Sequence, residues 1–239
     1  MEKVLVIIPT YNEVENIQKV IDLTLNDKAY DILVVDDSSP DGTADLVLEL
    51  IKTHSNQLFL EQRARKEGLG KAYIHGFRWA LENNYDFIFE MDADLSHDPK
   101  ELSTMLDYLK SDYDLVIGSR YVKGINVVNW PLSRILLSYL ASVYVRWISF
   151  MPIKDPTAGF VGYTRTVLEQ LDFNKIRFVG YAFQIEMKFK IWKKGFNFKE
   201  HPIIFTNRVF GVSKMDGKII WEALSAVLIL RIKSIFNQI

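Results

Sequence analysis

Short apolar runs alternate with longer amphipathic segments through the first half of this 239-residue chain, and this alternation limits the possible folds more than any other feature. The apolar runs, nearly continuous as in buried parallel strands, are residues 4–8, 32–35, 58–60, 87–91 and 115–117. The segments that repeat apolar side chains every three or four residues, as amphipathic helices do, are residues 13–25, 43–54, 71–84 and 99–110. We therefore predict an α/β fold with a doubly wound, mostly parallel sheet.

The composition excludes several classes of protein and site. The 29 basic and 30 acidic residues leave a net charge of -1, so we expect no general attraction for nucleic acid. Cysteine is absent, which excludes disulfides and thiolate metal ligands and agrees with a cytoplasmic location. The apolar run at the amino terminus is too short for a signal peptide.

Two apolar segments in the second half raise the question of membrane contact. Residues 131–152 are interrupted by Arg134 and Arg146, and residues 221–236 carry Arg231 and Lys233. Neither segment provides the roughly 18 uncharged apolar residues of a spanning helix, so we predict no transmembrane helix. No repeat or flexible linker is visible, and we expect a single domain, residues 1–239, with an extension that begins near residue 129.

Polar residues follow every predicted strand. They lie in residues 9–13, 36–43, 63–71, 92–98 and 118–121. Because open α/β sheets bind ligands beyond the carboxyl ends of their strands, we expect these segments to meet at one site. Asp36 and Asp37 offer acceptors for a base or for ribose hydroxyl groups, and Tyr11 offers a ring face.

Two of these segments bear on the binding of a metal and a diphosphate. In an extended backbone Asp92 and Asp94 face the same side, and two carboxylates at one point suit Mg²⁺ or Mn²⁺; the alternative is a solvated acidic turn. The turn Gly68-Leu-Gly70-Lys71 lets the backbone approach a ligand and brings one cation. The alternative for Lys71 is a solvated lysine at the start of a helix.

Six motifs occur in the order in which family 2 glycosyltransferases carry them. They are Pro9-Thr-Tyr11-Asn-Glu13, Asp36-Asp37-Ser-Ser-Pro-Asp-Gly-Thr, Gly68-Leu-Gly70-Lys71-Ala, Asp92-Ala-Asp94-Leu-Ser-His-Asp-Pro, Gly118-Ser-Arg120-Tyr and Asp155-Pro-Thr-Ala-Gly159-Phe. From about residue 4 to residue 214 the chain therefore resembles this family, and within it the dolichyl- and polyprenyl-phosphate mannose synthases. The ordered set carries the resemblance, because single short motifs also match by accident.

The resemblance implies a GT-A fold, a GDP-mannose donor and a divalent cation, either Mg²⁺ or Mn²⁺. Residues 1–128 would bind the nucleotide sugar, and residues 129–239 would bind the acceptor through interfacial helices. The residues implied at the nucleotide are Pro9, Tyr11, Glu13, Asp36, Asp37 and Lys71. Asp92 and Asp94 would hold the metal against the diphosphate, with Ser96, where many relatives carry glutamine, as a third ligand.

The resemblance also places basic and hydroxyl side chains at the phosphate of a lipid acceptor. They are Arg120, Arg134, Ser138, Arg208 and Lys214. Independently of the family, several cations beside an acidic metal site suit a second anionic substrate. The alternative for Arg134 is a residue on an apolar helix whose charged end reaches water, and for Lys214 a solvated loop charge.

These residues imply a reaction at the anomeric carbon of mannose. A lipid phosphomonoester has a second pKa of about 6, so it is mostly ionised at neutral pH and needs no general base. Attack from the face opposite GDP would invert the anomeric centre while the metal stabilises the leaving diphosphate. Asp92, Asp94 and Arg120 form the expected catalytic group, whereas Glu186, where relatives with hydroxyl acceptors often carry a base, is expected to be structural or orienting.

The apolar residues at helical spacing in residues 131–152 allow two interpretations, core packing or one face lying in a bilayer interface. Because aromatic and basic residues border the run and a long lipid must reach the site, we favour a peripheral amphipathic anchor, with residues 221–236 as a second. The expected partners are GDP-mannose, polyprenyl or dolichyl phosphate and a membrane surface, on the cytoplasmic face.

Three alternative functions remain. A polyprenyl-phosphate glucosyltransferase that uses UDP-glucose would carry the same aspartates. A sugar nucleotidyltransferase would also need paired aspartates, but its usual loop rich in glycine and lysine is replaced here by residues 9–13. A non-enzymatic phospho-receiver module would share Asp36 and Asp37 but has no need for the residues after 129.

Overall fold

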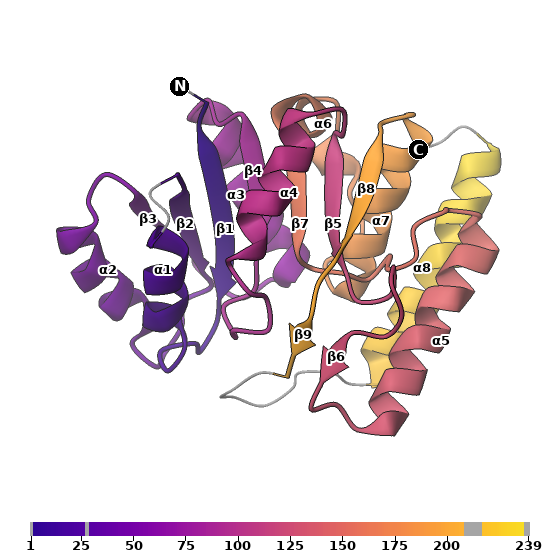
Figure 1. The fold of residues 1–239 in the computed structure, drawn as a ribbon, viewed down its shortest axis with the longest axis horizontal. Coiled ribbons are helices and arrows are strands. Elements are labelled where there is room, and N and C mark those ends of the chain that lie inside the picture. Colours follow the sequence, from indigo (N-terminus) through magenta and orange to yellow (C-terminus); the bar gives the residue numbers. More distant parts are fainter. Residues whose placement is uncertain (1, 27–28, 208–216, 237–239) are drawn as a thin grey trace.

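The computed structural model describes residues 2–26, 29–207 and 217–236, with side chains from residue 224 onward in the last segment. Seven strands form one sheet in the order β3-β2-β1-β4-β7-β5-β8 (Figure 1). They are β1 (Val4–Thr10), β2 (Asp31–Asp36), β3 (Leu58–Gln62), β4 (Phe87–Glu90), β5 (Leu115–Ser119), β7 (Val161–Thr164) and β8 (Phe198–Pro202). All are parallel except β7, which runs antiparallel to β4 and β5. The predicted α/β fold with a mostly parallel sheet is confirmed.

Helices fill most of the connections between the strands. They are α1 (Ile17–Leu25), α2 (Thr43–Thr53), α3 (Leu69–Glu82), α4 (Glu101–Lys110), α5 (Leu132–Ser149), α6 (Arg165–Glu169), α7 (Tyr181–Lys193) and α8 (Gly217–Ile235). The first begins later than the predicted residue 13, because the N–H groups of Asn16 and Ile17 both donate to the carbonyl of Glu13 in a turn. Among the described residues, none of these helices combines the length and apolar character needed to cross a bilayer.

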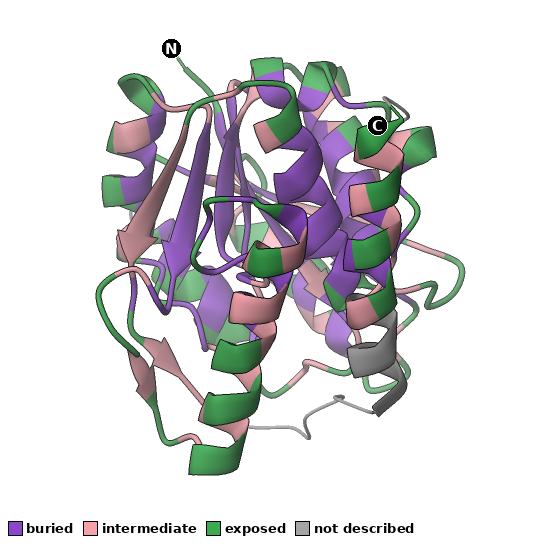
Figure 2. Cartoon of the chain, turned by 90° about the vertical axis from the view of Figure 1, so that its right-hand side faces the viewer, coloured by how far each residue is buried: buried purple, intermediate pink, exposed green. Residues whose placement is uncertain are grey.

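The sheet separates two hydrophobic cores, as the alternation of side chains along a strand requires. On β1, Leu5 and Ile7 pack with α3, α6 and α7, whereas Val4, Val6 and Ile8 pack with α1, α2 and α4 on the other face (Figure 1). Figure 2 shows the inner strands buried between these helices, whereas β8 at the edge of the sheet is only partly buried. Their nearly continuous hydrophobicity follows from this burial on both faces.

The antiparallel strand β7 was not predicted. It has four residues, and its sequence Val-Gly-Tyr-Thr gives no clear alternation. Val161, its first residue, lies opposite both Glu90 at the end of β4 and Ile117 on β5. The loop before β7 therefore reaches the same edge of the sheet as the carboxyl ends of the parallel strands. Although β7 and β8 belong to the main sheet, the division between residues 128 and 129 stays a prediction.

The two longest helices, α5 and α8, lie side by side beyond β8 (Figures 1 and 2). The hydroxyl of Tyr144 on α5 donates to the carbonyl of Leu224 on α8, at 3.2 Å. Beyond the carboxyl edge of the sheet, β6 (Val127–Val128) and β9 (Phe205–Thr206) form a short parallel pair. Together these elements extend the molecule past the sheet on the side where the strands end.

We predict that Gly162→Ala lowers the free energy of unfolding by about 2 kcal/mol, because overpacking a dense core costs about this much. A Cβ at Gly162 would lie 2.5 Å from Phe89 Cε1 and 2.9 Å from Leu109 Cδ1, both inside the core. Urea denaturation measures the change. Gly159→Ala is the matched control, since its nearest neighbour would lie at 3.7 Å; equal midpoints for the two variants would contradict the packing.

Candidate active site

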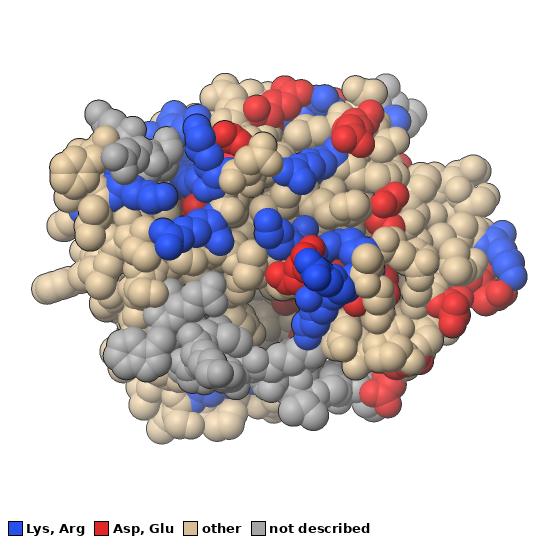
Figure 3. Space-filling model, turned by 180° about the vertical axis from the view of Figure 1, so that it is seen from behind, with Lys and Arg blue, Asp and Glu red and all other residues tan. Residues whose placement is uncertain are grey.

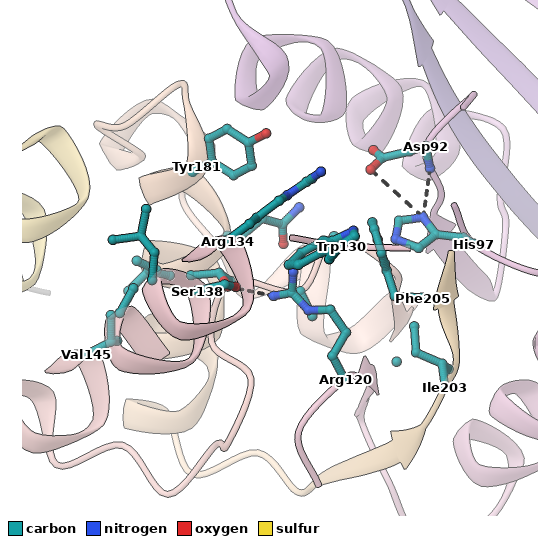
Figure 4. Close-up of a pocket in the computed structure, with 18 of the residues that line it drawn as sticks. Asp92, His97, Arg120, Trp130, Arg134, Ser138, Val145, Tyr181, Ile203 and Phe205 are labelled. Carbon is teal, nitrogen blue, oxygen red and sulfur yellow. Dashed lines mark hydrogen bonds and ion pairs between the residues drawn. The ribbon is translucent and has the colours of Figure 1, made fainter. Parts of the chain in front are cut away.

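A cavity of about 170 Å³ opens at the carboxyl ends of β4 and β5 (Figure 4). Its polar end is lined by Asp92, Asp94, His97, Arg120, Trp130, Arg134 and Ser138. Its apolar end lies among α5, α7 and α8 and is lined by Leu137, Ala141, Val145, Ile185 and Leu224. One continuous cavity thus joins the predicted metal ligands, three of the predicted acceptor residues and an apolar interior.

The acidic pair lies where β4 ends. Asp92 Oδ1 accepts a hydrogen bond from the Tyr73 hydroxyl at 3.4 Å, and Asp94 Oδ1 accepts one from the backbone N–H of Ser96 at 3.1 Å. Between the acids and Ser96, Leu95 adopts a φ of 62°, a left-handed conformation that costs free energy in a bulky residue. The local backbone is therefore bent sharply to place this loop.

The donor set fits a hard divalent cation. Two carboxylates line one end of the cavity, and the hydroxyl oxygen of Ser96 is buried without a hydrogen-bond partner in the described part of the chain. Oxygen ligands of this kind suit Mg²⁺ or Mn²⁺. Within the described residues no cluster of three or more His, Cys, Asp or Glu side chains offers a competing site. Ser96 as a third ligand stays a prediction that this orphaned oxygen supports.

His97 is a site residue that the sequence alone did not single out. Its Nδ1 accepts a hydrogen bond from the backbone N–H of Asp92 at 3.2 Å (Figure 4), and its ring stacks on Phe160 with centroids 5.0 Å apart. Burial lowers the pKa of His97 to about 4, and the nearby Asp94 charge only partly offsets this effect. The imidazole is therefore neutral at ordinary pH and fixes the backbone of Asp92.

Arg120 is held by a buried carboxylate. Its Nε and Nη2 donate to the two oxygens of Asp155 at 2.8 and 2.6 Å, and Nη2 also donates to the Thr157 hydroxyl. Burial alone would lower the pKa of Arg120, but the charge of Asp155 outweighs it and raises that pKa. Asp155 and Thr157 belong to the sixth motif of the sequence analysis. The sequence showed that motif, but only the structure shows that it holds Arg120.

Arg134 and Ser138 come from the first turns of α5. The Arg134 guanidinium lies 3.9 Å from the centroid of the Trp130 ring, and its Nη1 donates to Asn207 Oδ1 at 3.0 Å. Figure 4 shows Arg134 extending across the cavity in the direction of Asp92. The Tyr121 hydroxyl donates to Ser138 Oγ at 2.7 Å, which leaves the Ser138 hydrogen available to a ligand. Arg208 and Lys214 lie outside the described residues.

The predicted nucleotide residues surround the ends of β1 and β2. None of Pro9, Tyr11, Glu13, Asp36, Asp37 and Lys71 is among the described residues that line the cavity. Their loops are joined by side chains: Asn12 N–H donates to Ser39 Oγ, and Glu13 N–H donates to Thr43 Oγ1. Lys66 Nζ lies 4.0 Å from the centroid of the Tyr11 ring, and Lys71 is exposed in the first turn of α3.

The two neighbouring aspartates play different parts. Asp36 is fully buried, and its carboxylate accepts hydrogen bonds from the Thr10 hydroxyl and from the N–H and hydroxyl of Ser39. Asp37 forms an ion pair with Arg63 at 3.0 Å, and burial raises its pKa although Arg63 lowers it. Asp36 therefore shapes the loop. We propose that Asp37 is the member of the pair that binds the nucleobase of the donor.

The backbone of the turn at Gly68 and Gly70 lies close to other residues of the protein. A Cβ at Gly70 would lie 2.7 Å from Phe183 Cδ2, and one at Gly68 would lie 3.0 Å from Val179. The N–H of Gly70 donates to the carbonyl of Val179 at 2.8 Å. These glycines therefore let α3 pack against the start of α7, and the interpretation that they also bring the backbone to a ligand stays a prediction.

The chain belongs to glycosyl transferase family 2, whose model matches residues 5–172. It is 45% identical over 227 residues to a polyprenol monophosphomannose synthase of Mycolicibacterium smegmatis, covering 95% of this chain and 86% of that protein. It is 43% identical to an undecaprenyl-phosphate mannosyltransferase of Micrococcus luteus, covering 93% and 91%. A dolichol-phosphate mannosyltransferase of Pyrococcus furiosus is 39% identical, covering 93% of this chain and 62% of the relative.

Solved structures show the same fold at low sequence identity. Glucosyl-3-phosphoglycerate synthase from Mycobacterium tuberculosis, in complex with Mn²⁺, UDP and glucosyl-3-phosphoglycerate, matches with a TM-score of 0.68 and 17% identity, covering 96% of this chain and 80% of that one. The mannosyltransferase PcManGT from Pyrobaculum calidifontis, in complex with GDP-Man and Mn²⁺, matches with a TM-score of 0.57 and 17% identity, covering 99% and 72%. Both comparisons support the GT-A type of fold.

Proposed function

We propose that this chain transfers mannose from GDP-mannose to a polyprenyl or dolichyl phosphate, with inversion at the anomeric carbon and dependence on Mg²⁺ or Mn²⁺. The observation that carries the proposal is the single cavity, which runs from Asp92 and Asp94 past Arg134 and Ser138 into an apolar interior. A nucleotide diphosphate needs the first part, a phosphate the second and a lipid chain the third. The names of the three close relatives support the same acceptor class.

The position of the Glu186 carboxylate favours a phosphate over a sugar hydroxyl group as the nucleophile. Glu186 on α7 is buried, and its Oε2 accepts hydrogen bonds from the backbone N–H groups of Arg177 and Phe178. Its Oε1 pairs with Lys190 at 3.1 Å. This carboxylate holds a loop and is not among the described residues that line the cavity. A phosphomonoester needs no base, so the arrangement suits it.

We assign different roles in the reaction to different described residues. Asp92 and Asp94 would hold the cation, which supplies positive charge to the leaving diphosphate when bound. Arg134 would bind and orient the acceptor phosphate, since a planar guanidinium can form two parallel hydrogen bonds. Arg120, whose Nε and Nη2 already donate to Asp155 and Thr157, would offer its Nη1 N–H groups. The Ser138 hydroxyl, oriented by Tyr121, would donate a further hydrogen bond. The apolar walls exclude water that would otherwise compete as an acceptor.

The outer face of α5 favours contact with a membrane. Trp147, Leu140 and Leu136 are 80%, 60% and 51% exposed, whereas the buried positions of the helix include Ser142 and Ser149. Large side chains therefore face outward and small ones face the core, the reverse of a helix that only covers a core. We propose that α5, with exposed side chains of α8, lies in the interface of the cytoplasmic leaflet.

Charge on the molecular surface gives no sign of a nucleic-acid partner on the face that Figure 3 shows. Lys and Arg form several separate groups there, with Asp and Glu among them. The absence of a nucleic-acid partner stays a prediction from the net charge of -1.

A donor panel tests the function. With undecaprenyl phosphate and Mn²⁺, labelled GDP-mannose should give a mannolipid, and chelation of the metal should stop its formation. A product from UDP-glucose and none from GDP-mannose would replace the proposed mannosyl transfer with the glucosyl alternative.

Asp92→Asn and Asp94→Asn should each lower kcat at least 100-fold without unfolding the protein, because the metal stabilises charge on the leaving diphosphate.

Asp98→Asn is the control for these variants. Asp98 is an exposed acid of the same loop, and its carboxylate caps the N–H of Lys100. Its replacement should leave turnover near the wild-type value, whereas near-normal turnover in either of the other two variants at saturating metal would disprove the assignment.

We predict that Arg134→Ala raises the KM for lipid phosphate about 10- to 100-fold and leaves the KM for GDP-mannose within twofold, because hydrogen bonds to charged groups are worth this much. Arg134→Lys should recover only part of the loss, since an ammonium lacks the planar fork that stacks on Trp130. Arg78→Ala, on the outside of α3 where Arg78 bonds to Asn174, is the control. If the lipid saturation curves of Arg134→Ala and the wild type coincide, Arg134 does not bind the lipid phosphate.

Replacing Leu136 and Leu140 together by Ser should lower affinity for phospholipid vesicles about tenfold or more, because each loses apolar area that would be buried in the bilayer. GDP affinity should not change. The control replaces Leu23 and Leu48, which are exposed on α1 and α2, by Ser. Equal flotation of the two folded double variants would count against α5 as the anchor.

A further inference from the structure

A buried polar network lies directly behind the cavity. Glu90 ends β4 just before Met91 and Asp92, and Lys188 and Gln184 face it from α7. Lys188 Nζ donates to Gln184 Oε1 at 2.9 Å and to the carbonyl of Ala158 at 2.7 Å. Gln184 Nε2 donates to Glu90 Oε2. All three ionic or amide side chains are at least 98% buried, so each depends on the others for hydrogen bonds.

These partners fix the orientation of the Gln184 amide. An ammonium only donates hydrogen bonds, so Lys188 must face the amide oxygen, while the carboxylate of Glu90 accepts from the amide nitrogen. A flipped amide would bring the nitrogen against the ammonium. After these contacts the oxygen keeps one lone pair and the nitrogen keeps one N–H. The side chain is therefore a rigid pair of one acceptor and one donor.

Gln184 also lines the cavity, together with Asp92 and Asp94, which we assign to the donor, and Arg134 and Ser138, which we assign to the acceptor. Its amide contacts Glu90, two residues before Asp92 in the chain. In a transfer between a diphosphate and a phosphate, the sugar must lie between these groups. A sugar hydroxyl both donates and accepts, so two neighbouring hydroxyl groups complement an amide whose two ends are fixed.

We propose that Gln184 is a sugar-binding residue that hydrogen-bonds hydroxyl groups of the transferred hexose, and that Lys188 and Glu90 are positioning residues that hold its amide. The proposal rests on the proposed function only in requiring a nucleotide sugar in this cavity. The proposal explains why charged groups are buried here although their burial costs free energy. A site that binds sugar hydroxyl groups binds them more tightly when its hydrogen-bonding groups are already held in place.

A purely structural role predicts different results. Such a network would join β4, α7 and the loop at Ala158, and weakening it would lower stability and affect every ligand alike. Binding to the sugar predicts a loss confined to the sugar part of the donor. Affinity for GDP alone separates the two, because GDP lacks the hexose.

The test compares wild type with Gln184→Met, which keeps the length of the side chain but removes both hydrogen-bonding atoms. With Mn²⁺ present, titration calorimetry gives the Kd for GDP, and turnover gives kcat/KM for GDP-mannose and for its 2-, 3-, 4- and 6-deoxy analogues. The Kd for GDP should stay within twofold, and kcat/KM for GDP-mannose should fall about 10- to 100-fold. At least one deoxy analogue that wild type disfavours should lose that disadvantage in the variant.

Tyr163→Phe is the matched control within the network. Tyr163 donates to Glu90 Oε1 at 3.1 Å and is not among the described residues of the cavity wall, so this variant should lose stability but keep the discrimination. If Gln184→Met does not fold, Gln184→Asn keeps the amide but shortens its reach and should show the same losses. Equal losses for GDP and GDP-mannose, or unchanged discrimination against every deoxy analogue, overturn the proposal. If wild type binds UDP-glucose instead, the same series with UDP sugars tests Gln184 although the donor assignment has failed.

Discussion

The direction of one short strand organises the candidate active site. Because β7 runs antiparallel between β4 and β5, the loop before it arrives at the edge where those two strands end. That loop supplies Asp155 and Thr157 to Arg120, Gly159 beside Asp92, and the Ala158 carbonyl to Lys188. A parallel strand in this position would begin at the opposite edge and deliver its preceding loop there. The antiparallel direction of this four-residue strand thus brings the proposed donor-binding and acceptor-binding side chains together.

The ion pair of Arg120 with Asp155 has an electrostatic consequence for the proposed acceptor site. A buried guanidinium without a counter-ion is costly, and breaking such a pair commonly costs about 3–5 kcal/mol, so the carboxylate stabilises the fold. It also neutralises the charge that Arg120 brings to the cavity. Arg120 therefore acts as a rigid set of donors, whereas Arg134 stacks on the Trp130 indole and donates to Asn207.

Local patterns predicted the parts of this structure that local physics determines. The inner parallel strands are buried on both faces, so their apolar runs are plain in the sequence, and the acids after Met91 follow from the abrupt end of one run. Tertiary contacts decided the rest. Both Asp36 and Asp37 are buried, but Asp36 is held by Thr10 and Ser39 whereas Asp37 pairs with Arg63, and no spacing shows this difference. Gln184 and Lys188 looked like ordinary positions of a helix, and only the packing of α7 behind β4 revealed their contacts with Glu90.

The two sides of α5 connect the proposed membrane contact with the proposed chemistry. Leu136 and Leu140 are exposed on its outer face, while Leu137 and Ala141, each the next residue along the helix, line the apolar end of the cavity. Successive residues on a helix are about 100° apart, so the outer apolar surface and the cavity wall adjoin along one edge. A polyprenyl chain could pass over that edge from the bilayer without crossing a polar surface, and its phosphate would then meet Arg134 and Ser138 one turn or less away. For a chain in which no described helix is suited to crossing a bilayer, this edge offers a physical route by which a water-insoluble acceptor reaches a polar site.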